Sequence, residues 1–316
     1  MTDWLKHNSP HMFRFLQILL ILFLGLIVTY ALSIGLAALV YNKSLPEIMQ
    51  AVSTLDSPGN IDILKFMQVI QSICLFIIPS FIIVKSFRQN IPGWLKLNTA
   101  PTIQGIMLIM LIMVLVIPFI NYLSSLNEEM KLPNVLKSFE EWMKSTENYA
   151  QKLTEAFLKM GSVKGLLFNL FMMALLPAFG EELLFRGVIQ RVFSEWFRNI
   201  HWGIFLSAAF FSAFHLQFYG FIPRLLLGVM FGYFLVWSGS LWLPVAGHFM
   251  NNALAVIYYF FFSSQKSGYN LDTVGSSPDT YWYAVGSAII TISLLCVLYY
   301  HNKQILKKSG HGNFEW

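Results

Sequence analysis

Residues 165–190 read GLLFNLFMMALLPAFGEELLFRGVIQ, and this stretch decides the fold class. It is long enough to cross a bilayer, because a helix rises about 1.5 Å per residue and the hydrocarbon core is about 30 Å thick. It also contains Glu181, Glu182 and Arg186, although charged groups at membrane depth are costly and need a reason to be there. The stretch therefore predicts a transmembrane helix that carries functional charges.

The rest of the chain is equally apolar. Hydrophobic residues make up 56% of the 316 residues and charged residues only 12%, about half the charged fraction of a soluble domain. We therefore expect the lipid bilayer to surround this chain. The net charge of +5 comes from basic residues that flank apolar segments, and no aromatic and basic stripe predicts nucleic-acid binding.

Apolar runs of bilayer length predict an all-α, polytopic transmembrane helix bundle with about eight spans. We treat residues 1–316 as a single integral membrane domain. The predicted spans are residues 15–41, 64–85, 103–125, 165–190, 202–218, 221–238, 241–262 and 281–300.

Basic residues alternate between the connections and predict the orientation. Ten basic residues and three acids lie in the N-terminal region, the second and fourth connections and the C-terminal tail. The charged residues of the first and seventh connections are mostly acidic. The positive-inside rule then predicts that both termini are cytosolic, and we expect the cell (inner) membrane. The basic residues are Lys6, Arg14, Lys85, Arg88, Lys96, Arg191, Arg198, Lys303, Lys307 and Lys308, and the acids are Asp3, Glu195 and Glu315.

The connection between the third and fourth spans, residues 126–163, is long, nearly neutral and rich in Lys and Glu. Its apolar residues recur at helical spacings, which predicts one or two amphipathic helices at the outer membrane interface. A solvated helical hairpin without membrane contact is the alternative.

Within the fourth span, the two adjacent glutamates are expected to differ. Glu182 and Arg186 are four residues apart, so they lie on one helix face and can pair. Glu181 is turned by about 100° from Glu182 and has no partner in its own helix. Pro177 cannot donate a backbone hydrogen bond and leaves a carbonyl free one turn before the acids. Glu181 is therefore the stronger candidate for chemistry.

Later spans add polar groups that can act with Glu181. His215 follows Phe211 by one helical turn, and Asn252 follows His248 by one turn. A carboxylate and an imidazole that share one water form a general base, and a second His with an Asn can donate hydrogen bonds to an oxyanion. These four groups, which are Glu181, His215, His248 and Asn252, would suffice to attack an amide carbonyl with water.

Three motifs follow one another along the chain, namely Glu181-Glu182-x-x-x-Arg186, Phe211-x-x-x-His215 and His248-x-x-x-Asn252. Together they resemble the motifs of the CAAX protease and bacteriocin-processing family (the CPBP or Abi family), which includes the type II prenyl-protein endopeptidases. The motif-bearing core covers residues 165–260. The resemblance implies an intramembrane endopeptidase of the glutamate type.

The resemblance also implies a role for each residue. By that analogy Glu181 and His215 activate water, His248 and Asn252 stabilise the oxyanion, and Glu182 and Arg186 support them. The substrate would be a peptide or protein, with its lipid modification left open. The expected site opens toward the cytosol.

Alternatives remain at this point. Glu181, His215 and His248 could bind Zn²⁺ with water as a fourth ligand, although we expect no metal and no cofactor, because Asn252 suits an oxyanion hole and the His-Glu-x-x-His pattern is absent. A proton-coupled transporter could use the same groups as a relay. A non-catalytic bacteriocin-immunity or scaffold protein could retain the fold.

Overall fold

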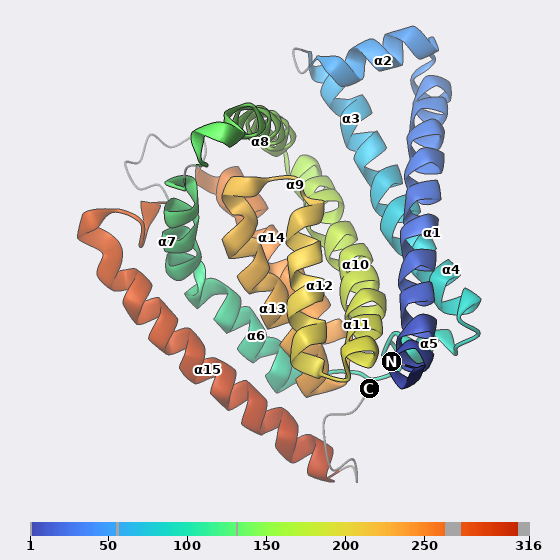
Figure 1. The fold of residues 1–316 in the computed structure, drawn as a ribbon. Coiled ribbons are helices and arrows are strands. Elements are labelled where there is room, and N and C mark those ends of the chain that lie inside the picture. The colour runs from blue at the N-terminus through green and yellow to red at the C-terminus, as the bar shows by residue number, and fades with distance from the viewer. Residues whose placement is uncertain (1, 55–56, 131, 263–272, 309–316) are drawn as a thin grey trace.

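The computed structural model describes residues 2–54, 57–130, 132–262 and 273–308, and these residues form helices and turns without a β-strand (Figure 1). The helices are α1 (Thr2–Tyr41), α2 (Leu45–Ser53), α3 (Pro58–Gln71), η1 (Ser72–Ile77), α4 (Ile78–Ser86), α5 (Ile91–Trp94), α6 (Ile103–Leu115), α7 (Ile117–Glu128), η2 (Asn134–Leu136), α8 (Lys137–Leu158), α9 (Val163–Asn169), η3 (Leu170–Leu175), α10 (Leu176–Glu182), η4 (Leu183–Ile189), α11 (Gln190–Phe197), α12 (Ile200–Phe214), η5 (Phe218–Gly220), α13 (Phe221–Ser238), α14 (Trp242–Phe262), η7 (Pro278–Thr280) and α15 (Tyr281–Lys308).

The prediction of a polytopic helical bundle is confirmed, and the number of spans is approximate. Among the described residues, six helices are long and apolar enough to cross a membrane, and α6 with α7 forms a seventh that is bent by 45°. Pro118 is the second residue of α7 and explains the bend, because it has no N–H to continue the hydrogen bonding of α6. The remaining predicted span is α12, which has 15 residues and reaches only about 22 Å.

The fourth predicted span lies at the centre of the bundle. α9, η3, α10, η4 and α11 form one continuous run, and α12, α13 and α14 pack beside it (Figure 1). All seven residues of η4 are buried, and its apolar side chains Leu183, Leu184, Phe185, Val188 and Ile189 are 0% exposed. The middle of the central run is therefore enclosed by other helices on all sides.

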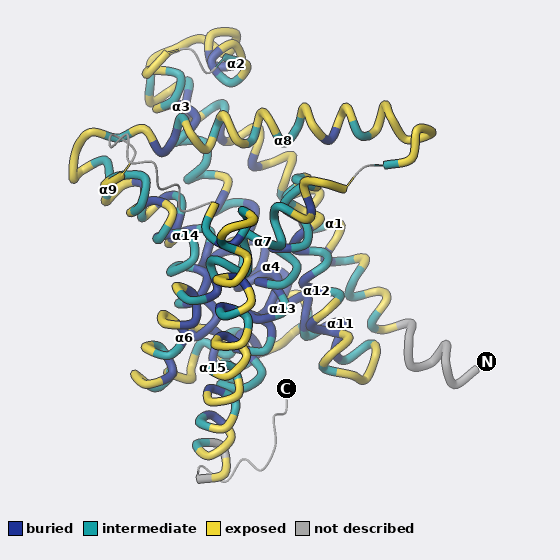
Figure 2. Tube along the Cα trace, turned by 90° about the vertical axis from the view of Figure 1, so that its left-hand side faces the viewer, coloured by how far each residue is buried: buried dark blue, intermediate teal, exposed yellow. Residues whose placement is uncertain are grey.

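The outer helices expose apolar side chains, as helices surrounded by lipid do. α1 and α15 are mostly exposed in Figure 2, and Phe23 and Ile289 are 61% and 60% exposed. In water such surfaces would favour aggregation. Together with the six candidate spans, they make this chain a multi-pass membrane protein.

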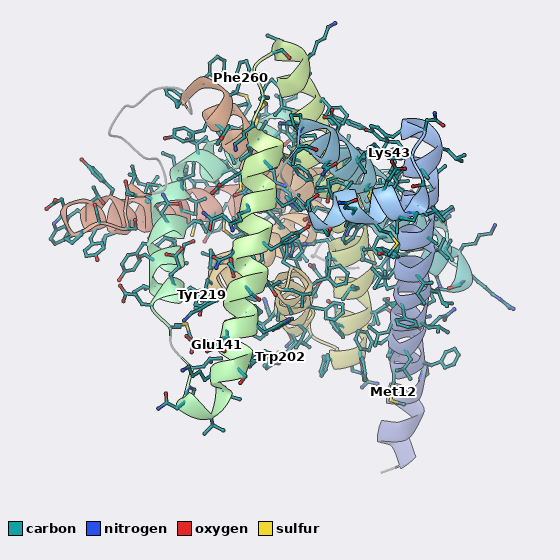
Figure 3. All side chains as sticks on the ribbon, turned by 90° about the horizontal axis from the view of Figure 1, so that it is seen from above. Met12, Lys43, Glu141, Trp202, Tyr219 and Phe260 are labelled. Carbon is teal, nitrogen blue, oxygen red and sulfur yellow. The ribbon has the colours of Figure 1, made fainter. Side chains whose placement is uncertain are left out.

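The helix α8 lies across one end of the bundle, opposite the end where α1 begins and α15 ends (Figures 1 and 2). Figure 3 shows it from above, with Glu141 on its length and Tyr219 of the neighbouring loop. Met143, Phe157 and Leu158 are its buried residues, and Phe157 packs with Leu64 of α3 and Met172 of η3. The amphipathic connection predicted for residues 126–163 thus contains a 22-residue helix, while its location at the membrane interface stays a prediction.

Close helix packing between α12 and α13 helps to position the site. A Cβ atom at Gly228 would lie 2.9 Å from the Cβ of Ala208 and 3.2 Å from its Cα. Because Ala208 belongs to a helix backbone, it cannot give way as a flexible side chain could. The glycine therefore sets how closely the two helices approach.

Gly228→Val should lower the thermal unfolding midpoint in detergent by a few degrees, since overpacking costs about 1–3 kcal/mol. Gly286→Val is the matched control, because no atom lies within 4 Å of a Cβ at Gly286 on α15. Both substitutions place valine in a helix, so their difference isolates the packing. Equal midpoints for the two variants would contradict this account of the α12–α13 contact.

Candidate active site

The segment around Glu181 has unusual helix geometry. α10 lies between two π-helical segments, η3 and η4, and such segments are frequent at functional sites. Pro177 has no N–H to donate toward the carbonyl of Met173, four residues earlier. Asn252 on α14 donates from Nδ2 to that carbonyl at 3.2 Å. The irregular turn therefore receives a hydrogen bond from one of the predicted site residues.

Glu182 is the buried centre of the cluster. One carboxylate oxygen lies 3.0 Å from Nε of Arg186, and both side chains are at most 1% exposed. The other oxygen lies 2.8 Å from Nδ1 of His248 on α14. The expected Glu182–Arg186 pair is present, and the bond to His248 was not predicted. Glu182 therefore joins its own helix to α14 through charge-assisted hydrogen bonding.

Arg186 is enclosed by groups that suit a cation. Its Nη2 donates to the carbonyl of Gly228 at 3.2 Å. Its guanidinium carbon lies 4.5 Å from the ring centre of Phe211 and 5.4 Å from that of Phe231, within the range of cation–π attraction. A carboxylate, a carbonyl and two aromatic faces thus compensate for burying this charge.

Glu181 faces the two histidines instead. Its Oε2 lies 3.8 Å from Nε2 of His248 and 4.0 Å from Nε2 of His215. That oxygen is buried and has no hydrogen-bond partner within the described chain. The side chain of Glu181 is 12% exposed and that of His215 is 29% exposed. Glu181 and His215 therefore lie at the accessible edge of the cluster, and Glu182 lies beneath it.

The partners of each imidazole indicate which nitrogen carries its proton. Nδ1 of His215 lies 2.9 Å from the carbonyl of Phe211, which can only accept. Nδ1 of His248 faces the Glu182 carboxylate. We therefore assign a proton to Nδ1 in both rings. In neutral His215 this leaves a lone pair on Nε2, directed toward the Glu181 side of the site.

Phe211 is at the centre of the aromatic packing that holds these rings. Its ring centre lies 4.9 Å from that of His215 and 5.9 Å from that of His248, both edge to face. Phe231 stacks on the other side of His248 at 5.2 Å. Offset and edge-on aromatic contacts restrict ring orientation. Phe211 was expected as a supporting residue, whereas Phe231 had no signal in the sequence beyond its hydrophobicity.

The distances at the site suit a shared water more closely than a tetrahedral metal. A water about 2.8 Å from Glu181 and from either Nε2 would make an angle of about 85–90° at its oxygen. Tetrahedral zinc ligands at about 2.0–2.2 Å from the ion lie about 3.3–3.6 Å apart. Zinc would require Oε2 of Glu181 to lie closer to Nε2 of His215 and of His248 than the observed 4.0 and 3.8 Å. Among the described residues, no three His, Cys, Asp or Glu are arranged to hold a metal ion.

Arg224 is a charged residue near the site that sequence reasoning missed. It belongs to α13 and donates from Nη1 to the carbonyl of Gln217 at 2.9 Å. It also interacts electrostatically with Glu181. Arg224 lies near the start of the predicted span 221–238. In the sequence it therefore resembles the basic residues that flank the other predicted spans, although it lies within this one.

Glu182→Gln should destabilise the protein by about 3–5 kcal/mol, because it leaves the buried Arg186 without its counter-charge. Glu181→Gln is the matched control, since the Glu181 carboxylate oxygen Oε2 lacks a hydrogen-bond partner. Chemical or thermal unfolding in detergent measures both variants. If Glu181→Gln were as destabilising as Glu182→Gln, the division between a structural and a free glutamate would be wrong.

Comparison with known proteins finds a family that the segment around this cluster resembles. Residues 163–254 match the family described as "Type II CAAX prenyl endopeptidase Rce1-like". An uncharacterized protein of Bacillus subtilis (strain 168), YpbD, is 30% identical over 90 residues, which are 27% of this chain and 43% of that protein. The aligned segment thus spans less than half of that relative, and no solved structure matches.

The matched segment contains every residue of the three motifs, from Glu181 to Asn252. The family is named for an endopeptidase activity. The resemblance noted in the sequence is confirmed over this segment, because residues 163–254 match the Rce1-like family of type II CAAX prenyl endopeptidases.

Proposed function

We propose that this protein is an intramembrane endopeptidase that hydrolyses a peptide bond with water activated by Glu181 and His215. The observation that carries the proposal is the buried Oε2 of Glu181, which has no hydrogen-bond partner in the described chain and faces two imidazole Nε2 atoms at 3.8 and 4.0 Å. A carboxylate held this way has its acceptor capacity free for a water. The same water can reach Nε2 of His215.

In the proposed reaction, His215 accepts a hydrogen bond from this water at Nε2 and orients it. Glu181 takes a proton as the water oxygen bonds to the carbonyl carbon, and the carbonyl electron pair moves to its oxygen. The carbonyl then re-forms, the carbon–nitrogen bond breaks, and the proton on Glu181 passes to the leaving nitrogen. The products are a carboxylic acid and an amine, so the water is fully accounted for.

His248 and Asn252 are proposed to stabilise the oxyanion. His248 donates from Nδ1 to Glu182, so it donates to the oxyanion from Nε2 when the ring carries a second proton. The side-chain amide of Asn252 donates one N–H to the Met173 carbonyl, and its second N–H can donate to the oxyanion. Fixed donors of this kind stabilise developing charge because they need no reorganisation.

The remaining cluster residues are proposed to position these groups. Glu182 orients His248, Arg186 compensates for the Glu182 charge, and Phe211 supports both histidine rings. The substrate is proposed to be a peptide or protein that reaches the site from the membrane or its surface. The proposed location is the cell membrane, with both termini in the cytosol.

Glu181→Gln and His215→Asn should each reduce peptide hydrolysis by about 10²–10⁴-fold, because each removes a group that activates the water. The assay incubates purified protein in detergent with a mixture of hydrophobic peptides in ¹⁸O-water and detects labelled new termini by mass spectrometry. Glu128→Gln, at an exposed residue of α7, is the matched control and should cleave normally. Normal cleavage by both site variants would exclude this mechanism.

The same assay distinguishes the metal-free mechanism from zinc catalysis. We expect cleavage to survive dialysis against a strong chelator, since no zinc ion takes part in the proposed steps. Loss of cleavage on chelation, with recovery on adding Zn²⁺, would assign Glu181, His215 and His248 as metal ligands instead. Proton-coupled flux without any cleavage would favour a transporter.

The charge distribution predicts access from the cytosolic side, whereas the exposed part of the site follows the end of α12 that is farther from Arg191 and Arg198, and Leu216 there is 59% exposed. Because Tyr219 of the same loop is hydrogen-bonded to Glu147 of α8, the opening is proposed at the end of the bundle beside α8, opposite the start of α1 and the end of α15. Leu216→Cys, made with Cys74→Ala and Cys296→Ala, should then react with a membrane-impermeant maleimide added on the side opposite the termini. Reaction only from the cytosolic side would contradict this and favour the cytosolic opening.

A further inference from the structure

Arg224 is a cation beside the site that the proposed chemistry does not use. Its Nη1 donates to the carbonyl of Gln217 at 2.9 Å, and Nη2 contacts the Oε1 of the same residue. Gln217 follows His215 by two residues. A side chain at Gly220 would collide with this guanidinium, so the glycine leaves room for it. The loop after His215 is thus folded around the Arg224 side chain.

Two carboxylates act electrostatically on Arg224, namely Glu181 in the site and Glu147 on α8. Glu147 accepts a hydrogen bond from the backbone N–H of Tyr219 at 3.0 Å, and Tyr219 belongs to the loop that contacts Arg224 through Gln217. Arg224 is therefore within electrostatic range of one carboxylate in the site and one on the covering helix.

Arg224 nevertheless lacks a salt bridge. None of the ion pairs within 4.0 Å among the described residues includes it. A guanidinium has five N–H donors, and the contacts of Arg224 with Gln217 occupy two of its nitrogens. Arg186 shows the contrast, because its charge is compensated by Glu182 at 3.0 Å. A partly buried cation with unused donors is costly to the fold unless a ligand engages it.

We propose that Arg224 is a binding subsite for a carboxylate of the peptide substrate, located beside the scissile bond. The inference rests on the proposed function, since Glu181 and His215 define where that bond lies. Arginine recognises carboxylates through two parallel N–H bonds. The carboxylate is either the C-terminus of the peptide or an acidic side chain near the cut. Its negative charge also keeps it away from Glu181 and directs it to the Arg224 side.

The test measures binding to Glu181→Gln protein, so that it does not depend on cleavage. Three fluorescent hydrophobic peptides of one sequence are compared: a free C-terminal acid, its C-terminal amide, and an amide with Asp in place of Asn near its end. We expect the acid or the Asp peptide to bind about tenfold or more tightly than the neutral amide, as charge-assisted bonds predict. The preferred peptide identifies the source of the carboxylate.

Adding Arg224→Gln should abolish this preference while leaving the affinity for the neutral amide within about threefold. Arg224→Lys should retain part of it, because lysine keeps the charge without the paired donors. Glu147→Gln is the matched control and should preserve or strengthen the preference by removing a competing carboxylate. A purely structural role for Arg224 predicts that all three peptides weaken together.

Equal binding of the three peptides to the Glu181→Gln protein would overturn the proposal, even if every Arg224 variant failed to fold. Failure of the proposed function looks different: wild-type protein would then leave the peptides uncut, whatever their binding preference. The two results are independent, because one is a ratio of dissociation constants and the other is a cleavage rate.

Discussion

The arrangement of the site depends on the buried carboxylate of Glu182, which is held between Arg186 and His248 with no exposure to solvent. A buried charge is tolerated only where partners compensate for it. Here the partners lie on the same helical run and on α14, and Arg186 extends the contacts to the Gly228 carbonyl on α13. One ionised group thereby sets the relative positions of three helices at membrane depth.

This constraint also explains why two adjacent glutamates can have different roles. One residue along a helix is a rotation of about 100°. The rotation that directs Glu182 toward Arg186 directs Glu181 toward His215 and His248, at the accessible edge of the cluster. Neutral partners could not hold the helix in that rotation as firmly, since charge-assisted bonds are stronger and more directional. The structural glutamate thus orients the free one.

Much of this could be predicted from the sequence. Hydropathy predicts the helical bundle, and the spacing of Glu182 and Arg186 predicts their pair, because both depend on local periodicity. The His248–Glu182 bond, the stacking of Phe231 and the hydrogen bond from Asn252 to Met173 depend on how separate helices meet, which no local pattern contains. Arg224 was missed for a related reason: a basic residue near the end of an apolar run is usually a flanking charge, and only the folded loop places it by the site.

The hydrogen bond between Glu147 and the backbone of Tyr219 joins the motif-bearing segment to a part of the chain outside the family match, which covers residues 163–254. The loop after His215 is therefore supported by α8, which contributes no residue to the three motifs. Under the proposed function, a change in α8 would alter the support of this loop while the hydrogen bonds and ion pairs of the motif residues stay the same. The choice of peptide would then depend in part on a helix that takes no part in the proposed reaction.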